Sequence, residues 1–248
     1  MYGALIVDTR DADPVVSDRE HTILLSDWTD EDPMRVFARL KKYGHYYNYN
    51  QRTLSDIRDD IARVGFAQNH RNRGMWNRMR MNDRDISDVT GASYTFLMNG
   101  AAPATNWTAL FARGERVRLR IINGSAMTIF DLRIPGLEMT VVAADGQYVE
   151  PVTVEEFRIG VAETYDVIVQ PSADTAYTVF AQAIGRLGFA RGTLAPAPGL
   201  EADVPELDAP PVLTMTDMGI ARAPVVFGWL NTDGNTDRIE DTLDHPLF

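Results

Sequence analysis

The feature that most constrains the fold is a series of short alternating segments between residues 93 and 195. In "ERVRLRII", Val117, Leu119 and Ile121 alternate with three arginines, of which Arg118 is the central one. A period of two is typical of a β-strand with one buried face, so we predict that the apolar side faces a core and the arginine side faces water. "FDLRI" repeats the pattern with Phe130 and Leu132.

Four more segments follow at intervals of roughly ten residues. They are "MTVVAADG", "EEFRIGV", "TYDVIVQ" and "AYTVFAQA", and turn residues such as Asp145-Gly146 separate them. Short strands at this rhythm are typical of an antiparallel sandwich or barrel. We therefore predict a mainly β fold, with the sandwich over residues 93–195.

Residues 31–92 have a different, helical character and read as an insert docked on the sandwich. "EDPMRVFARLKK" places a proline in a first helical turn, and Met34, Phe37 and Leu40 on one side. "TLSDIRDDIARV" spaces its apolar residues by three and four, with Thr53 as the expected N-cap. This apolar stripe consists of Leu54, Ile57, Ile61 and Val64.

The two ends of the chain are simpler. In residues 1–30, the runs "ALIV" and "TILLSDW" predict two strands joined by an acidic loop. Residues 196–248 begin with the Pro/Ala/acidic stretch "APAPGLEADVPELDAPP", which predicts a linker, and continue as an irregular tail.

Composition excludes several classes of protein. The formal net charge of -11 argues against a nucleic-acid-binding protein, which needs a basic face to displace counterions from phosphate. The chain has no cysteine, so thiolate nucleophiles and cysteine-ligated metal sites are excluded. No apolar run approaches the ~20 residues of a membrane span, and the N-terminus has no signal-peptide pattern.

An ordered set of motifs resembles one known family. "YTFLMNG", "GERVRLRIINGS", "AADG" and "AETYDVIV" occur in this order, after "REHTILLSDWTDEDP" and before a methionine pair. Together they resemble the multicopper oxidases of the copper-resistance protein A type, mainly their middle, cupredoxin-like domain, over about residues 2–219. The resemblance implies a cupredoxin-like antiparallel β-sandwich of Greek-key topology with a helical insert, in which "YGALIVD" is the exit strand of a preceding domain.

The resemblance also implies that the copper ligands of complete relatives lie in the domains on either side of this one. A type 1 copper site needs two imidazoles and a thiolate, and this chain has no thiolate. Its histidines, His21, His45, His70 and His245, are scattered without metal-ligand spacing. We therefore expect packing or surface roles for them, no catalytic or cofactor-binding residue, and no oxidase activity from this chain alone.

Methionines are the remaining candidates for copper, because thioethers suit Cu(I). The candidates are Met75, Met79, Met81, Met215 and Met218. Met75 and Met79 would share a helix face, but together with Trp76 they also fit the role of an apolar anchor for the insert. An acidic cluster, Asp27, Asp30, Glu31 and Asp32, has the chemistry for a hard cation and fits equally well as the carboxylates favoured at a helix N-terminus.

Three hypotheses follow. The first is a spacer within a copper-resistance oxidase whose complete relatives oxidise Cu(I) or phenolic compounds and reduce dioxygen. The second is a stand-alone module that holds Cu(I) through methionines or docks on an oxidase, and the third is a decayed gene product without function. The expected partners are the missing oxidase domains or a second copy, with "FLMNG" and the insert as contact regions. The resemblance implies a periplasmic location, and the chain would be cytoplasmic if Met1 is the true start.

Overall fold

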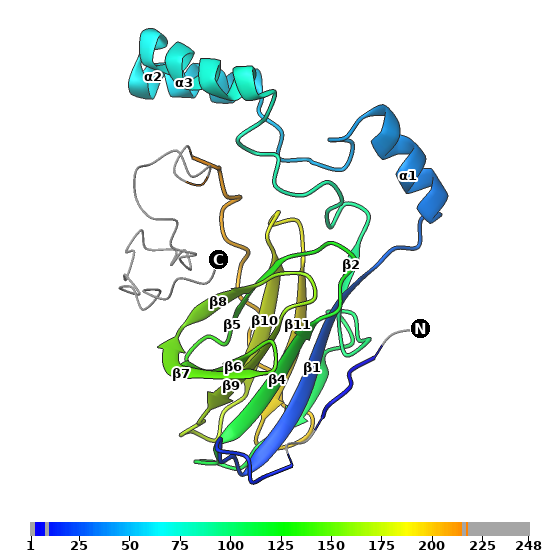
Figure 1. Cartoon of the computed structure of the whole chain (residues 1–248), viewed down its shortest axis with the longest axis vertical. Helices are drawn as coiled ribbons and strands as arrows, with labels where there is room; N and C mark the ends of the chain where they lie inside the picture. The colour runs from blue at the N-terminus through cyan, green and yellow to red at the C-terminus, as the bar shows by residue number, and fades with distance from the viewer. Residues whose placement is uncertain (1–2, 8–9, 215–216, 218–248) are drawn as a thin grey trace. The chain divides into compact units, whose positions relative to one another are not determined.

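The computed structural model describes residues 3–7, 10–214 and 217. Residues Met1–Val212 form one compact unit, and Leu213–Phe248 are a second unit of which little is described. The first unit is a β-sandwich with three helices (Figure 1). No helix within the described ranges has the length and apolar content needed to cross a bilayer.

Eleven strands form the two sheets of the sandwich. The first sheet has the order β2-β1-β4-β9-β6-β7 and the second has the order β3-β11-β10-β5-β8. The strands of the first sheet are β1 (Arg19–Trp28), β2 (Thr95–Met98), β4 (Val117–Asn123), β6 (Met139–Ala144), β7 (Gln147–Val154) and β9 (Thr164–Val169). Those of the second are β3 (Trp107–Leu110), β5 (Phe130–Arg133), β8 (Glu156–Ile159), β10 (Tyr177–Ala183) and β11 (Phe189–Ala195).

The core lies between the two sheets and consists of the inward side chains that the alternation predicts. Val117, Leu119, Ile121, Phe130 and Leu132 have no exposed surface. Asp145 and Gly146 form the two-residue turn between β6 and β7, and both have positive φ angles, as a type I′ hairpin requires. The predicted mainly β sandwich is confirmed.

Strand pairing is more varied than the antiparallel prediction. β1 pairs with β4 in parallel, and β11 pairs with β3 in parallel, whereas the other ladders are antiparallel. Parallel neighbours need a long connection, and the helical insert between β1 and β2 is part of the one that leads from β1 to β4. Alternation within one strand carries no information about the direction of its neighbour.

The arginine face of β4 is less exposed to solvent than the alternation predicts. Arg118 is only 2% exposed, although the alternation places it on the water side. Its guanidinium donates to Asp13, 2.6 Å away, and to Asp166 on β9, 3.0 Å away. Residues before β1 therefore cover part of the outer face of the first sheet, held there by a buried ion pair.

One predicted strand is absent. Residues 3–7, which include "ALIV", have no regular secondary structure, and Leu5 and Val7 are 84% and 78% exposed. A strand needs a hydrogen-bonded neighbour, and no described strand pairs with this segment. The second predicted strand of this region is confirmed as β1.

The helices lie between β1 and β2 in the sequence. They are α1 (Pro33–Lys42), α2 (Leu54–Val64) and α3 (Phe66–Met79), and α2 packs against α3 (Figure 1). Thr53 caps α2 as predicted, in a reciprocal capping box with Asp56. The stripe on α2 is only partly covered, since Ile61 and Val64 are half-buried whereas Leu54 is 84% exposed.

Helix α1 buries a side chain other than the three that the sequence places on one side. Val36 is buried and contributes to a small cluster with Tyr47 and Val89, whereas Met34 and Phe37 are 69% and 55% exposed. Of the three side chains that the sequence places together, Leu40 packs on the cluster, and Met34 and Phe37 face outward.

Candidate functional site

The predicted methionine site lies at the end of α3. The helix ends in a left-handed residue, Arg80, whose N–H donates to the carbonyl of Asn77, while the N–H of Met81 donates to the carbonyl of Trp76. This pair of hydrogen bonds is a Schellman motif, which turns the chain back over the last turn of the helix. The backbone of Met81 is thereby tied to the turn that contains Trp76.

The three methionines of this region differ from Trp76 in burial. Trp76 is 5% exposed, whereas Met75 and Met81 are 38% and 41% exposed, and Met79 is half-buried. Met75 and Met79 lie one turn apart, so they share a helix face. Trp76 thus fills the predicted anchor role, while at least two thioethers are open to solvent.

Ion pairs fix the chain around this helix end. Arg73 on α3 lies 2.8 Å from the carboxylate of Asp83, and Arg52 lies 3.3 Å from the same carboxylate and also pairs with Asp60 on α2. Asp83 is 6% exposed. Burial lowers the pKa of Arg52, and the positive charge of Arg73 lowers it further.

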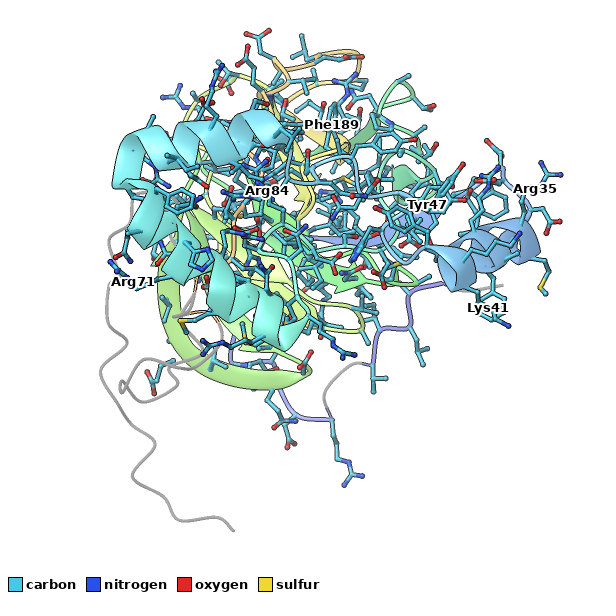
Figure 2. All side chains as sticks on the ribbon, turned by 90° about the horizontal axis from the view of Figure 1, so that it is seen from above. Arg35, Lys41, Tyr47, Arg71, Arg84 and Phe189 are labelled. Carbon is cyan, nitrogen blue, oxygen red and sulfur yellow. The ribbon has the colours of Figure 1, made fainter. Side chains whose placement is uncertain are left out.

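This ion-pair cluster (Arg52, Asp60, Arg73 and Asp83) ties both helices to the segment that follows Met81. Arg84, in that segment and labelled in Figure 2, pairs with Asp56 of the α2 capping box at 3.1 Å. The cluster could not be recognised in the sequence, because its pairs join residues 8, 10 and 31 positions apart and share no common spacing. The cluster holds the methionine site in place.

The side chains here that could donate to a metal ion are the thioethers of Met75, Met79 and Met81. Such donors match Cu(I), and they do not match a type 1 centre, which needs a thiolate. Within the described residues, no three histidine, cysteine, aspartate or glutamate side chains come together in a way that could hold a metal ion. Met215 and Met218 lie outside the described residues.

The histidines occupy separate places. His21 Nε2 lies 2.8 Å from the carbonyl oxygen of Leu110, and its ring meets Trp107 edge-on. His45 Nδ1 lies 2.9 Å from Asp85, and His70 stacks on Phe66 within α3. His245 lies outside the described residues.

The acidic cluster is also divided among separate partners. Asp27 accepts from the Thr128 hydroxyl at 2.7 Å, and Asp30 accepts from the indole of Trp28 at 3.0 Å. Glu31 binds Tyr47 and Arg39, while Asp32 accepts from the N–H of Met34 as the N-cap of α1. Only Asp32 has the predicted role at a helix N-terminus, while the other three carboxylates bind side-chain or backbone groups elsewhere in the fold.

Comparison with known proteins gives consistent matches. The multicopper oxidase family profile matches residues 68–197. Copper resistance protein A of Escherichia coli is 58% identical over 220 residues, which cover 89% of this chain and 36% of that protein. Multicopper oxidase MmcO of Mycobacterium tuberculosis is 30% identical over 250 residues, covering 100% of this chain and 44% of its own length.

A solved structure shares the fold. The crystal structure of Fet3p, a multicopper oxidase that functions in iron import, superposes with a TM-score of 0.52 at 15% identity, over 81% of this chain and 32% of that one. Its fold is the cupredoxin-like sandwich that the motifs predict. The chain spans little more than a third of the length of the copper resistance protein that it matches.

Proposed function

Because this chain belongs to the multicopper oxidase family, we propose that it is the central, non-catalytic portion of a copper-resistance oxidase. Other portions of that oxidase would supply the copper sites that oxidise Cu(I) or phenolic compounds and reduce dioxygen. The observation that carries the proposal is a complete sandwich core in a chain that has no cysteine. A scaffold needs the core, and a type 1 centre needs the thiolate.

In this role the sandwich fixes the separation of the two flanking portions, and its partners are those portions. The two sheets pack face to face on one apolar core, and a close-packed core of this kind makes the unit suited to act as a rigid spacer. The proposed location is the periplasm, in keeping with the family resemblance.

A chimaera tests this proposal. The matched 220-residue region of the Escherichia coli relative is replaced by the corresponding region of this chain, and copper loading and oxidase activity are measured. We expect the chimaera to keep the blue-copper absorption and the activity of the parent. A chimaera that is folded but inactive would reject the scaffold role, and a chimaera carrying Leu119→Asp serves as the misfolded control.

A second candidate function is Cu(I) binding by Met75, Met79 and Met81. The exposure of Met75 and Met81 beside a fixed helix end favours it. Cu(I) is titrated under reducing conditions into the wild type and a variant with all three methionines changed to leucine, a replacement of similar volume. We expect the variant to lose uptake.

The matched control is Met34→Leu, since Met34 is an exposed methionine on another helix. A further variant, with Met215 and Met218 changed to leucine, tests the two candidates that lie outside the described residues. Uptake that is the same in the wild type and the triple variant would eliminate binding at the end of α3.

A further inference from the structure

The outward side of α1 is both apolar and cationic. Met34 and Phe37 are 69% and 55% exposed. Arg35, Lys41 and Lys42 are exposed on the same helix, and Figure 2 labels Arg35 and Lys41 on it. The ammonium of Lys41 lies 5.4 Å from the centre of the Phe37 ring. From Pro33 to Lys42 the helix has no acidic residue. We name these five residues the cationic face.

The cationic face is presented on a fixed base. On its inner side, Val36 is 8% exposed and packs in a cluster with Tyr47 and Val89. The Tyr47 hydroxyl donates to Glu31 at 2.8 Å, and Asp32 caps the start of the helix. These contacts hold the inner side of α1 in place. The fold itself therefore keeps the cationic face exposed.

Tyrosines extend the exposed surface beyond the helix. Tyr43, Tyr46 and Tyr49 are 49%, 43% and 68% exposed, in the segment directly after α1. Tyrosine, methionine and arginine are enriched in protein interfaces, because they contribute large contact areas with polar ends. Apolar side chains rimmed by charge mark this side of the insert as an interaction surface.

A second exposed surface has the opposite charge. β7 is the last strand of the first sheet, and Tyr148, Val149 and Val152 are 45%, 39% and 44% exposed on it. Glu150 on the same strand and Glu155 directly after it are also exposed. We name these five residues the acidic edge. No described strand pairs with the outer side of β7.

The two surfaces lie too far apart to meet within one molecule. α1 follows β1, which lies next to the β2 edge of the first sheet, whereas β7 forms the opposite edge. Figure 1 shows α1 and β7 on opposite sides of the unit. A contact between the two surfaces therefore requires two molecules.

We propose that the cationic face of one molecule binds the acidic edge of a second copy. The two surfaces are complementary in charge, and each has apolar side chains at its centre. The contact uses two different patches, so it is heterologous, and it forms rings or open chains of molecules. This proposal is independent of the proposed scaffold function.

The prediction that "FLMNG" is a contact region is contradicted by the burial of its side chains. Phe96 and Met98 of that segment are 2% and 0% exposed, because they face the core of their own sandwich. The Asn99 side chain accepts from the N–H of Leu24 and donates to the carbonyl of Thr22. The segment is thus occupied within the molecule, and only the insert remains as a predicted contact region.

A charge-swap experiment on the full chain tests the proposal. Light scattering at low salt follows the wild type, a Lys41→Glu/Lys42→Glu variant and a Glu150→Lys/Glu155→Lys variant as a function of concentration. We expect association in the wild type and a loss of roughly tenfold or more in the association constant of each variant. Mixing the two variants should restore association, because their reversed charges are complementary.

Cross-linking identifies the contact directly. Lys41 and Lys42 are the only lysines in the chain, so a carbodiimide that joins amines to carboxylates has two side-chain amines to use. We expect an intermolecular cross-link from these lysines to Glu150 or Glu155. A wild type that stays monomeric at every concentration, or association that both charge reversals leave unchanged, would overturn the proposal. So would a monomer that instead binds vesicles of anionic lipid.

Discussion

In the sandwich, side chains such as Ile23, Leu119 and Phe130 have no exposed surface, whereas in the insert α2 buries no residue and α1 buries only Val36. Apart from Trp76 and the small cluster around Val36, the insert depends on hydrogen bonds and on the ion-pair cluster. Ion pairs near a surface contribute far less free energy than a packed apolar core. A region of this kind keeps its fold while leaving apolar side chains available to a partner.

The largest expected difference in the free energy of unfolding comes from making a leucine-to-alanine substitution once in the sandwich and once in the insert. Leu119→Ala removes a fully buried side chain, so we expect the free energy of unfolding to fall by about 3 kcal/mol. Leu54→Ala, at a position 84% exposed, should change it by less than about 0.5 kcal/mol. Urea unfolding measures both values, and a large loss in Leu54→Ala would show that the stripe on α2 is covered.

The next largest change in stability is expected where the insert meets the sandwich. A Cβ on Gly91 would lie 1.7 Å from the carbonyl oxygen of Leu187 in the turn between β10 and β11. Gly91→Ala must separate the end of the insert from that turn, at a cost of about 2 kcal/mol or more. Gly44→Ala is the control, since nothing lies within 4 Å of its added Cβ. Equal thermal stability of the two variants would contradict this junction.

The cap of α2 has a smaller, local effect. Thr53→Ala removes the side chain that accepts from the N–H of Asp56, which should destabilise the helix by about 1 kcal/mol. Hydrogen exchange should show faster exchange of α2 amides and unchanged protection in the sandwich. Faster exchange in both regions would mean that insert and sandwich unfold together.

Acid should weaken the same cap. Hydrogen bonds from Thr53, with help from Arg84, lower the pKa of Asp56 to about 2. Its pKa is lower in the folded state than the unfolded value near 4, so its contribution is complete above about pH 4 and is lost as the pH falls through about 2. Exchange of α2 amides between these pH values, compared with Asp56→Asn, measures the step. A wild type and an Asp56→Asn variant with the same pH dependence would contradict it.

Local patterns in the sequence predicted the parts of the fold that depend on local preferences. Alternation found β4, and the spacing of Leu54 and Ile57 with the cap at Thr53 found α2 within its exact bounds. Alternation did not predict β7, where Pro151 and Glu150 interrupt the pattern on an edge strand with both faces exposed.

Features that depend on distant residues were not predictable from one sequence. The burial of Arg118 depends on Asp13, and the burial of Val36 on α1 depends on Tyr47 and Val89. The spacing of residues within β4 or α1 does not indicate these partners. The methionines at the end of α3 were found by residue type alone. No spacing in the sequence indicates that Met75 and Met81 are exposed while Trp76 is buried.

The absence of catalysis by this chain alone is measured as oxygen consumption by the purified, copper-loaded chain, supplied with cuprous ion or a phenol as electron donor. The account predicts a rate equal to that of the same copper and donor without protein, because a chain with no cysteine cannot form the type 1 centre that accepts the electrons. Protein-dependent oxygen uptake by this chain alone would contradict it.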